Sequence, residues 1–357
     1  MKQNLYLFSN TILRKKDNTL LIETSPLSEA AHKADIENDD FENLLIPAPF
    51  ENGETKKYIP AENVEAIYSF GLIKFNSQFL SFLGNHQIPL HIFNYYGNYI
   101  GSFIPKSDIS AGNILINQVA NYLDPIKRLY IAKKFVRAAG LNAIANLKYY
   151  AYRGVDLSVQ ISNIQNLIDT ISSIISIEQL FGIEGNIKSN YYSCWSNILR
   201  QDLDFHKRVQ RPPDNIVNCL LSFGNVVFYG IVLTEIFRTG LSPAIGYLHS
   251  PGNNRNSLSF DIAEIFKPVI VDKVIFRTIN TESITDSGFI KKNNLLYMKE
   301  ETKKIFIKAI EDRLKTTFLH PDLKRNITYK TLIRLECYSL IKYLRGLDDY
   351  VPFLYEP

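Results

Sequence analysis

Three acidic side chains and one histidine in the second half of the chain have the types and spacing of a metal site. His249 and Glu264 lie in the stretch GYLHSPGNNRNSLSFDIAEIFKP, residues 246–268, where Asp261 precedes Glu264 by three positions. Residues three apart share a face of a helix, so both carboxylates can point at one place. Glu184 lies farther up the chain, in FGIEGNIKSNYY. Carboxylates with an imidazole suit a divalent metal that acts on phosphate.

Each of these residues also has an ordinary structural interpretation. A histidine after the apolar segment GYL can be a satisfied core residue, and Asp261 and Glu264 can simply stabilise the positive end of a helix. Glu184, between Gly182 and Gly185, can be a surface residue on an irregular turn. Glycines inside a helix cost roughly 1 kcal/mol each, which often indicates close packing or the close approach of a ligand. Taken together, the four residues favour a metal site.

The ligand types select among metals. Oxygen-rich ligation with one imidazole suits Mg²⁺ or Mn²⁺, and the histidine favours Mn²⁺. Zinc is less suitable, because no cysteine is near the set in the sequence. One ion is expected, with a second possible through Asp261. The metal would polarise a phosphoryl oxygen and bind the attacking or leaving oxygen.

Basic residues near these ligands in the sequence are candidates for contacts with a DNA backbone: Lys188, Arg208, Arg211, Arg255 and Lys267. Arginine can bind a phosphate through two hydrogen bonds. Arg211 precedes two prolines and a helix that Asp214 could cap, but a salt bridge to Asp214 or Asp204 is an equal alternative. Nearby aromatic residues could stack on bases or belong to the core: Tyr191, Tyr192 and Trp195.

The composition is that of a globular protein of about two domains. The chain has 357 residues, 46% of them hydrophobic and 21% charged, with a net charge of +4 that permits a nucleic-acid partner without demanding one. Cys194, Cys219 and Cys337 are too widely spaced for a disulfide framework or a zinc knuckle, which predicts reduced thiols in a cytoplasmic protein. The N-terminus lacks the apolar core of a signal peptide.

A charge-free segment from Ile216 to Thr234 resembles a membrane span in composition. It also holds several polar and small residues that are poor choices for facing lipid: Asn218, Ser222, Gly224, Asn225 and Gly230. We therefore expect a helix buried inside a helical domain and no membrane partner.

The first hundred residues are predicted to form β structure. Apolar runs within 5–23 surround a Lys-Lys-Asp-Asn turn and predict a hairpin, while 59–71 and 87–105 are rich in β-branched and aromatic residues. One short helix is expected near residues 77–84. A polar insert at about 24–57, acidic over 31–43, is predicted to be a mobile loop, with a partner-binding segment as the alternative.

The rest of the chain has helical periodicity. Residues 128–147 place apolar side chains on one stripe and a basic face opposite, which is either solvated or a nucleic-acid contact. Similar spacing predicts further helices at 161–177, 216–237, 262–276, 303–318 and 329–345. The predicted class is α+β, with a β domain at 1–100, a linker at 101–112 and a larger helical domain at 113–357.

Several of these segments together resemble a known family. The IEG segment around Glu184, the RPPDNIVN segment and GLSPAIGYLHSPGNNRNSLSFDIAEIFKP look like those of the CRISPR-associated integrase, the catalytic subunit of spacer acquisition (the Cas-one family). The β-rich segments IPAENVEAIYSFG and HIFNYYGNYIGSF resemble its N-terminal domain. The likeness covers almost the whole chain and is greatest to the type I-B variant.

The resemblance implies a β-sandwich-like N-terminal domain followed by an all-α catalytic domain. It implies a homodimer formed through the N-terminal domains, and two such dimers bridged by a dimer of the small ferredoxin-like Cas-two subunit. Glu184, His249 and Glu264 would be both the catalytic residues and the metal ligands, with Glu264 standing where many relatives have Asp. Asp261 would be a supporting acid. The polar insert is longer than the family's compact first hairpin leads one to expect.

The implied activity is a metal-dependent DNA integrase and endonuclease, a hydrolase-type enzyme acting on phosphodiesters. The 3′-hydroxyl of a short double-stranded prespacer would attack a phosphodiester in the repeat target. Two alternatives use the same residues differently. One is a structure-specific nuclease in DNA repair with water as the nucleophile, and the other is a non-catalytic DNA-binding scaffold whose acids cap helices.

Overall fold

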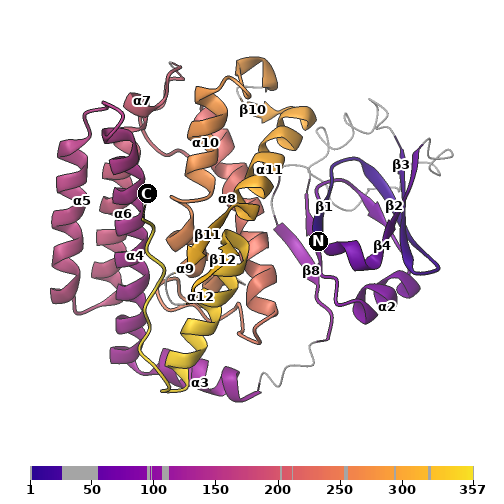
Figure 1. The fold of residues 1–357 in the computed structure, drawn as a ribbon, viewed down its shortest axis with the longest axis horizontal. Coiled ribbons are helices and arrows are strands. Elements are labelled where there is room, and N and C mark those ends of the chain that lie inside the picture. Colours follow the sequence, from indigo (N-terminus) through magenta and orange to yellow (C-terminus); the bar gives the residue numbers. More distant parts are fainter. Residues whose placement is uncertain are drawn as a thin grey trace. The chain divides into compact units, whose positions relative to one another are not determined.

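The chain folds into two compact units, Met1–Asp108 and Ile109–Pro357, in the computed structural model (Figure 1). The structure describes residues 2–25, 55–94, 97, 99–106, 112–201, 203–210, 212–252, 256–292, 295–320 and 323–356. The first unit is built mainly of strands and the second mainly of helices, which confirms the predicted α+β class. The division falls within the expected linker 101–112, although strand β8 extends to Phe103.

The N-terminal unit consists of two four-stranded sheets, in the orders β1-β5-β7-β8 and β4-β3-β2-β6. Its strands are β1 (Gln3–Leu7), β2 (Asn10–Lys16), β3 (Thr19–Ser25), β4 (Thr55–Pro60), β5 (Val64–Ser69), β6 (Ile73–Lys74), β7 (Leu90–Phe93) and β8 (Tyr99–Phe103). A short 3₁₀ helix, η2 (Ala61–Asn63), and helix α2 (Ser77–Asn85) complete it. Buried side chains of both sheets and α2, such as Leu13, Ile67 and Phe79, form one core. Two sheets around one core confirm the β-sandwich-like prediction.

The predicted hairpin is present but shorter than expected. Strands β2 and β3 pair antiparallel around the turn after Lys16, whereas residues 5–7 belong to β1, which pairs in parallel with β5. The ends of the predicted insert lie in strands, because Thr24 of β3 pairs with Thr55 of β4. The remainder of the insert, including its acidic stretch at 31–43, lies outside the described residues. The helix expected near 77–84 is α2.

The C-terminal unit is a helical assembly with two small hairpins. Its helices are α3 (Gly112–Leu123), α4 (Pro125–Ala151), α5 (Ser158–Thr170), η3 (Ile171–Ser173), α6 (Ile177–Ser193), α7 (Trp195–Ile198), α8 (Ile216–Phe237), α9 (Ser257–Phe266), α10 (Val271–Asn280), η4 (Asp286–Gly288), α11 (Glu300–Lys315) and α12 (Tyr329–Leu344). The hairpins, β9–β10 (Phe289–Lys292, Leu295–Met298) and β11–β12 (Thr317–His320, Arg325–Thr328), were not predicted. The helical character of the domain is otherwise as expected.

Three predicted helices are corrected at their ends. The helix expected at 303–318 is α11, which ends at Lys315 and is followed by strand β11. The helix expected at 161–177 stops at Thr170, and the next one, α6, begins at Ile177. The helix expected at 262–276 is two helices, α9 and α10, because Pro268 lies between them and cannot continue a helix. The second and third corrections matter, since α6 and α9 carry the acidic residues.

The largely apolar helix α8, whose one charged residue is Glu235, is the centre of this unit. Among the described residues it is the one helix whose length and composition could cross a membrane, and 72% of its most apolar window is buried. Helices α9, α10 and α12 pack against it, as expected for a core helix.

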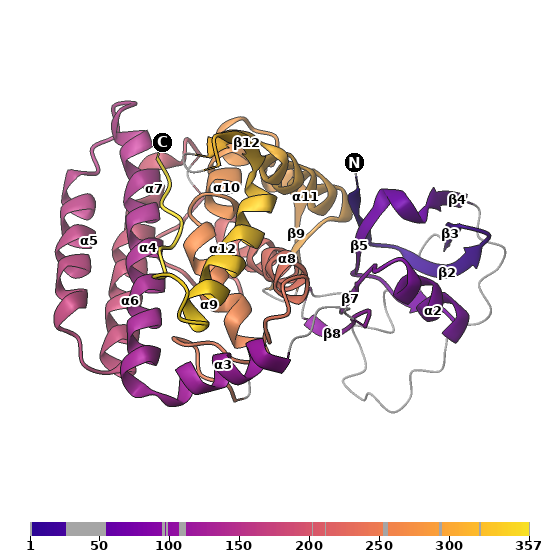
Figure 2. The same ribbon diagram turned by 60° about the horizontal axis from the view of Figure 1, so that its bottom comes forward.

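Helices α4, α5 and α6 pack side by side, and α4 also contacts α9 (Figure 2). Asp124 starts α4 by accepting hydrogen bonds from the backbone N–H groups of Ile126 and Lys127. The C-terminal tail is bound to this helix by Asn142, which donates to the Phe353 carbonyl and accepts from the Tyr355 N–H. Asn142 also donates to the Ile265 carbonyl of α9, so it joins α4, α9 and the tail.

Candidate active site

Helix α6 places Glu184 in the interior and several small residues at the surface. Ser176 caps the helix by accepting a hydrogen bond from the Gln179 N–H, and Glu184 is buried on the inner face with 7% exposure. Gly182 and Gly185 are exposed, and a Cβ atom at either would meet no atom of the described residues within 4 Å. The interpretation that these glycines mark close packing is therefore wrong, as is the picture of Glu184 on a surface turn.

Lys188 joins the two glutamates that the sequence keeps 80 residues apart. Its ammonium group contacts the Glu184 carboxylate one turn earlier on α6 and lies 3.1 Å from Oε2 of Glu264 on α9. Both carboxylate side chains are about nine-tenths buried. Burial alone would lower the pKa of Lys188, but the charges of Glu264 and Glu184 outweigh it and raise the pKa.

A second lysine completes the charge balance at Glu264. Lys267 lies one turn later on α9, with its ammonium 2.5 Å from Oε1 of Glu264, and it also donates to the Tyr229 hydroxyl of α8. Burial would raise the pKa of Glu264, but the ammonium groups of Lys188 and Lys267 lower it to about 2. Glu264 is therefore ionised at any pH near neutral.

His249 is held in place by Asp261. Both Nδ1 and the backbone N–H of His249 donate to Oδ1 of Asp261, at 2.6 and 3.0 Å, while the N–H groups of Tyr247 and Leu248 donate to Oδ2. Burial would lower the pKa of His249, but the hydrogen bond and charge of Asp261 raise it, and the charge of Glu264 adds to this rise. Since Nδ1 is bonded to Asp261, Nε2 is the nitrogen left for a ligand.

The hydrogen bonds of Asp261 and its position in α9 bear on two alternatives, a second metal ion and a role at the start of the helix. Both oxygens of Asp261 are engaged by the loop, so the structure gives no support for a second metal there. Asp261 and Glu264 lie beyond the first turn of α9, so their role is not to stabilise the start of the helix.

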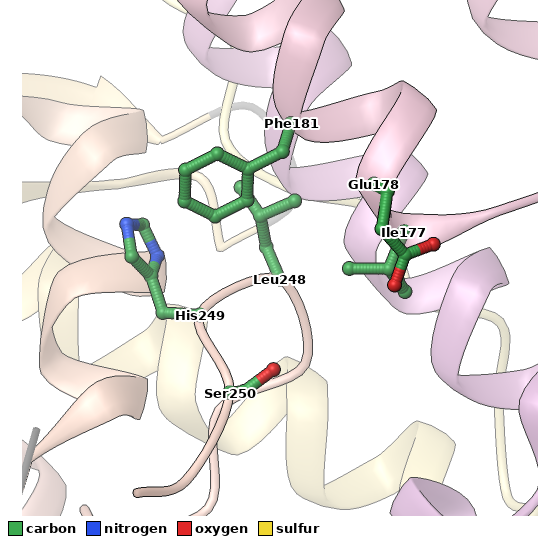
Figure 3. Close-up of a pocket in the computed structure, with 6 residues that line it drawn as sticks. All are labelled: Ile177, Glu178, Phe181, Leu248, His249 and Ser250. Atoms are coloured by element: carbon green, nitrogen blue, oxygen red, sulfur yellow. The ribbon is translucent and has the colours of Figure 1, made fainter. Parts of the chain in front are cut away.

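The imidazole also lies between two aromatic rings and beside an open pocket. Phe181 of α6 and Phe260 of α9 meet the His249 ring edge to face, with centroids 5.3 and 5.8 Å away. The pocket has a volume of about 490 Å³ and is lined by Ile177, Glu178, Phe181, Leu248, His249 and Ser250 (Figure 3). His249 therefore lies at the boundary between this pocket and the buried carboxylates, not in a closed core.

A divalent cation suits this donor set, although Lys188 now occupies part of it. Among the described residues no three His, Cys, Asp or Glu side chains are grouped closely enough to hold a metal. Yet the ammonium of Lys188 contacts Oε1 of Glu184 and Oε2 of Glu264, so it provides positive charge between the two glutamates. The ammonium group of Lys188 lies between the two glutamates, where a cation is needed, and the long lysine side chain can move away from them.

The five residues predicted to contact DNA fall into three groups. Lys188 and Lys267 bind the carboxylates, and Arg208 makes hydrogen bonds within the chain to Val209, Asn218 and Ser222. Arg211 and Arg255 lie outside the described residues. Helix α8 is capped by Asn215, not by Asp214, which instead accepts from the Asn218 side chain.

The nearby aromatic residues belong to the core. Tyr191 and Trp195 are buried, and Tyr192, Phe205 and Phe276 pack around Trp195. Base stacking is thus not their role.

Sequence reasoning missed Phe181, Tyr229 and Phe260 at the site. Phe181 and Phe260 could have been found from their spacing, three residues before Glu184 and four before Glu264. Tyr229 carried no such signal, since it lies on a different helix.

Comparisons with known proteins identify the family of this chain. Residues 5–312 match the family described as CRISPR associated protein Cas1. The CRISPR-associated endonuclease Cas1 of Fusobacterium nucleatum is 40% identical over 353 residues, which cover 99% of this chain and 96% of the relative. The chain belongs to the Cas1 family. Another Cas1 relative, the CRISPR-associated endonuclease Cas1 2 of Moorella thermoacetica, is 40% identical over 347 residues, 97% of each chain.

Solved structures show the same fold. A CAS1 protein from Thermotoga maritima superimposes with a TM-score of 0.81 at 32% identity, covering 98% of this chain and 99% of that one. A casposase bound to an integration product gives a TM-score of 0.83 at 20% identity, over 100% of this chain and 95% of the casposase. The Cas1 architecture thus extends over both units of this protein.

Proposed function

We propose that this Cas1 protein is a metal-dependent DNA integrase that joins short DNA fragments to a CRISPR repeat. The observation that carries the proposal is the pair of buried glutamates, Glu184 and Glu264, bridged by an ammonium group next to a histidine oriented by Asp261. Membership of the Cas1 family and the casposase of the same fold support it.

The metal ligands would be Glu184, His249 and Glu264, and the ion would be Mg²⁺ or Mn²⁺. Such an ion supplies positive charge to the phosphoryl group during transfer. Asp261 fixes the imidazole with Nε2 available, and Lys267 with Tyr229 fixes the Glu264 carboxylate. Lys188, freed from the glutamates, would carry an ammonium group to the edge of the site, where a phosphate can accept its hydrogen bonds.

The partners proposed are DNA, a second copy of the chain and a Cas2-type subunit. A chain of this fold occurs in a structure titled Cas6-RT-Cas1–Cas2 complex, with a TM-score of 0.76 at 18% identity, over 99% of this chain and 36% of that one. The roles of Arg208, Arg211 and Arg255 in DNA contact stay predictions, as does a cytoplasmic location.

A joining assay tests the proposal. A labelled double-stranded fragment is incubated with a supercoiled repeat plasmid, the Cas2-type subunit and Mn²⁺. Glu184→Gln keeps the shape of the side chain and removes its charge, and we expect a loss at least as large as the roughly 10–100-fold typical for groups around a metal ligand. Glu301→Gln, on the exposed start of α11, is the matched control. Full joining by Glu184→Gln would refute the assignment.

The same assay separates the alternatives. Relatives are named endonucleases, and cleavage without a joined product would indicate a nuclease that uses water. DNA binding with neither joining nor cleavage in Mg²⁺ or Mn²⁺ would indicate a scaffold.

A further inference from the structure

One face of helix α6 is open next to the candidate active site. With 3.6 residues per turn, Glu178, Phe181, Gly182 and Gly185 lie on adjoining parts of the helix surface, and all four are exposed. At 1.5 Å per residue, Phe181 and Glu178 lie roughly 4.5 and 9 Å from Glu184 along the helix axis. The two glycines leave the helix backbone bare between these side chains and Lys188.

Phe181 is the one exposed phenylalanine among the described residues, with 43% of its surface accessible. Its edge-to-face contact with His249 fixes the ring at the mouth of the pocket. In Figure 3 Phe181 reaches from α6 toward Leu248 and His249, and Glu178 lies beside Ile177 on the α6 side of the pocket. A fixed ring with an open face is suited to stacking on a flat, aromatic ligand, and every nucleobase offers such a face.

Glu178 decides which part of a nucleic acid fits here. Its pKa is lowered by a hydrogen bond from its own backbone N–H and by the Ser176 hydroxyl, so the carboxylate is ionised near neutral pH and only accepts hydrogen bonds. This carboxylate needs a donor from its ligand, and the exocyclic amino group of adenine, cytosine or guanine is one. Thymine has no such group. Glu178 therefore matches a base edge, while Arg128, which donates to the Ser250 hydroxyl at the same pocket, balances its charge.

We propose that this pocket is a nucleobase subsite, in which Phe181 stacks on the base of a nucleotide next to the reacting phosphodiester and Glu178 accepts from its exocyclic amino group. The subsite rests on the proposed function, because it is placed by its continuity with His249 and Glu184. It makes Glu178 a specificity-determining residue that disfavours thymine at one position.

Stacking is tested without chemistry, in EDTA. DNA that mimics the joined product carries the fluorescent base 2-aminopurine on one side or the other of the junction phosphate. We expect fluorescence quenching at one of the two positions with the wild type, Phe181→Tyr and Glu184→Gln, and its loss with Phe181→Ala. Phe181→Ala should also bind the DNA about fivefold more weakly or worse, the lower end for one lost stack. Equal quenching by the wild type and Phe181→Ala, or no quenching at either position, overturns the subsite.

Specificity is tested by placing each of the four bases at the quenched position. The wild type should join the thymine substrate about five- to tenfold more slowly than the other three, and Glu178→Gln, whose amide also donates, should reduce this difference. Equal rates for all four bases with the wild type contradict the role of Glu178. If no substrate is joined while quenching persists, the proposed function fails and the subsite stands.

A further variant, Gly185→Leu, separates an effect on DNA binding from an effect on folding. Gly185→Leu places a side chain in open space, and leucine is a better helix former than glycine, so the melting temperature should hold or rise. We expect it to block the approach of DNA and reduce the quenching. Quenching equal to that of the wild type would contradict the position of the subsite.

Discussion

Replacing Lys188 by methionine removes one charge from the centre of the site and keeps the apolar stem. Of the two buried carboxylates, only Glu264 would then keep an ammonium partner, that of Lys267. Glu184 would lose its one ion-pair partner among the described residues. Without a metal, Lys188→Met should therefore be less stable than the wild type.

The size of the effect follows from burial. Breaking a buried ion pair by removing one partner costs about 3–5 kcal/mol. The Lys188 side chain is 34% exposed and Glu264 keeps Lys267, so the cost should fall at or just below the bottom of this range, and we expect a loss of about 2–3 kcal/mol in EDTA. When Mn²⁺ binds to Lys188→Met, the ion no longer has to displace an ammonium group. Each tenfold gain in metal affinity would then restore about 1.4 kcal/mol.

Urea unfolding in EDTA and in millimolar Mn²⁺ measures both effects. Lys304→Met is the matched control, because Lys304 also pairs with a glutamate one turn earlier, Glu300, but at an exposed site. Its loss should be below about 0.5 kcal/mol and independent of metal. Two results would show that Lys188 does not stand in for the cation. One is a free energy of unfolding of Lys188→Met equal to that of the wild type in EDTA. The other is a gain in this free energy on adding Mn²⁺ that is no larger than the gain of the wild type.

Three further changes test other parts of the structure. Asp261→Asn should slow joining about 10–100-fold and lower the pKa of His249 in an NMR titration; an unchanged pKa contradicts the hydrogen bond. Gly246→Ala should also slow joining, since its Cβ would lie 2.7 Å from the His249 carbonyl oxygen and 2.8 Å from Oδ2 of Asp261; full activity at an unchanged melting temperature would disprove this. Burial raises the pKa of Glu336 from 4.5 to about 7, so the stability it contributes is complete below pH 4.5 and is lost as the pH rises to about 7. Between pH 4.5 and 8, Glu336→Gln should gain up to roughly 3 kcal/mol relative to the wild type in urea titrations, and a constant difference would contradict the shift.

Elements with strong periodicity could be predicted from the sequence. Helix α8 has the predicted bounds, because a predominantly apolar run of its length has few alternatives in a folded domain. The break between α9 and α10 was also readable, since Pro268 lies in the middle of the predicted helix. Helix α6 was missed as an element, because two glycines weaken its pattern and the capping serine, Ser176, was not weighed against them.

The bonds among the predicted site residues could not be predicted from the sequence. Lys188 and Lys267 were assigned to DNA by charge, although their spacing from Glu184 and Glu264 on a helix predicts ion pairs. The hydrogen bond from His249 to Asp261 closes a loop of twelve residues. Such a contact depends on how the loop returns to α9, and no local pattern encodes it.

Binding of Mn²⁺ tests most directly whether Glu184, His249 and Glu264 share one cation, because the electron spin of Mn²⁺ couples to the nuclei of its ligands. Spin-echo measurements on the full chain should detect one tightly bound Mn²⁺ with one nitrogen coupling, lost in His249→Gln. Glu184→Gln and Glu264→Gln should each weaken Mn²⁺ binding, while Glu301→Gln should not. Mn²⁺ that binds with no nitrogen coupling, and equally well in both glutamine variants, would contradict the account.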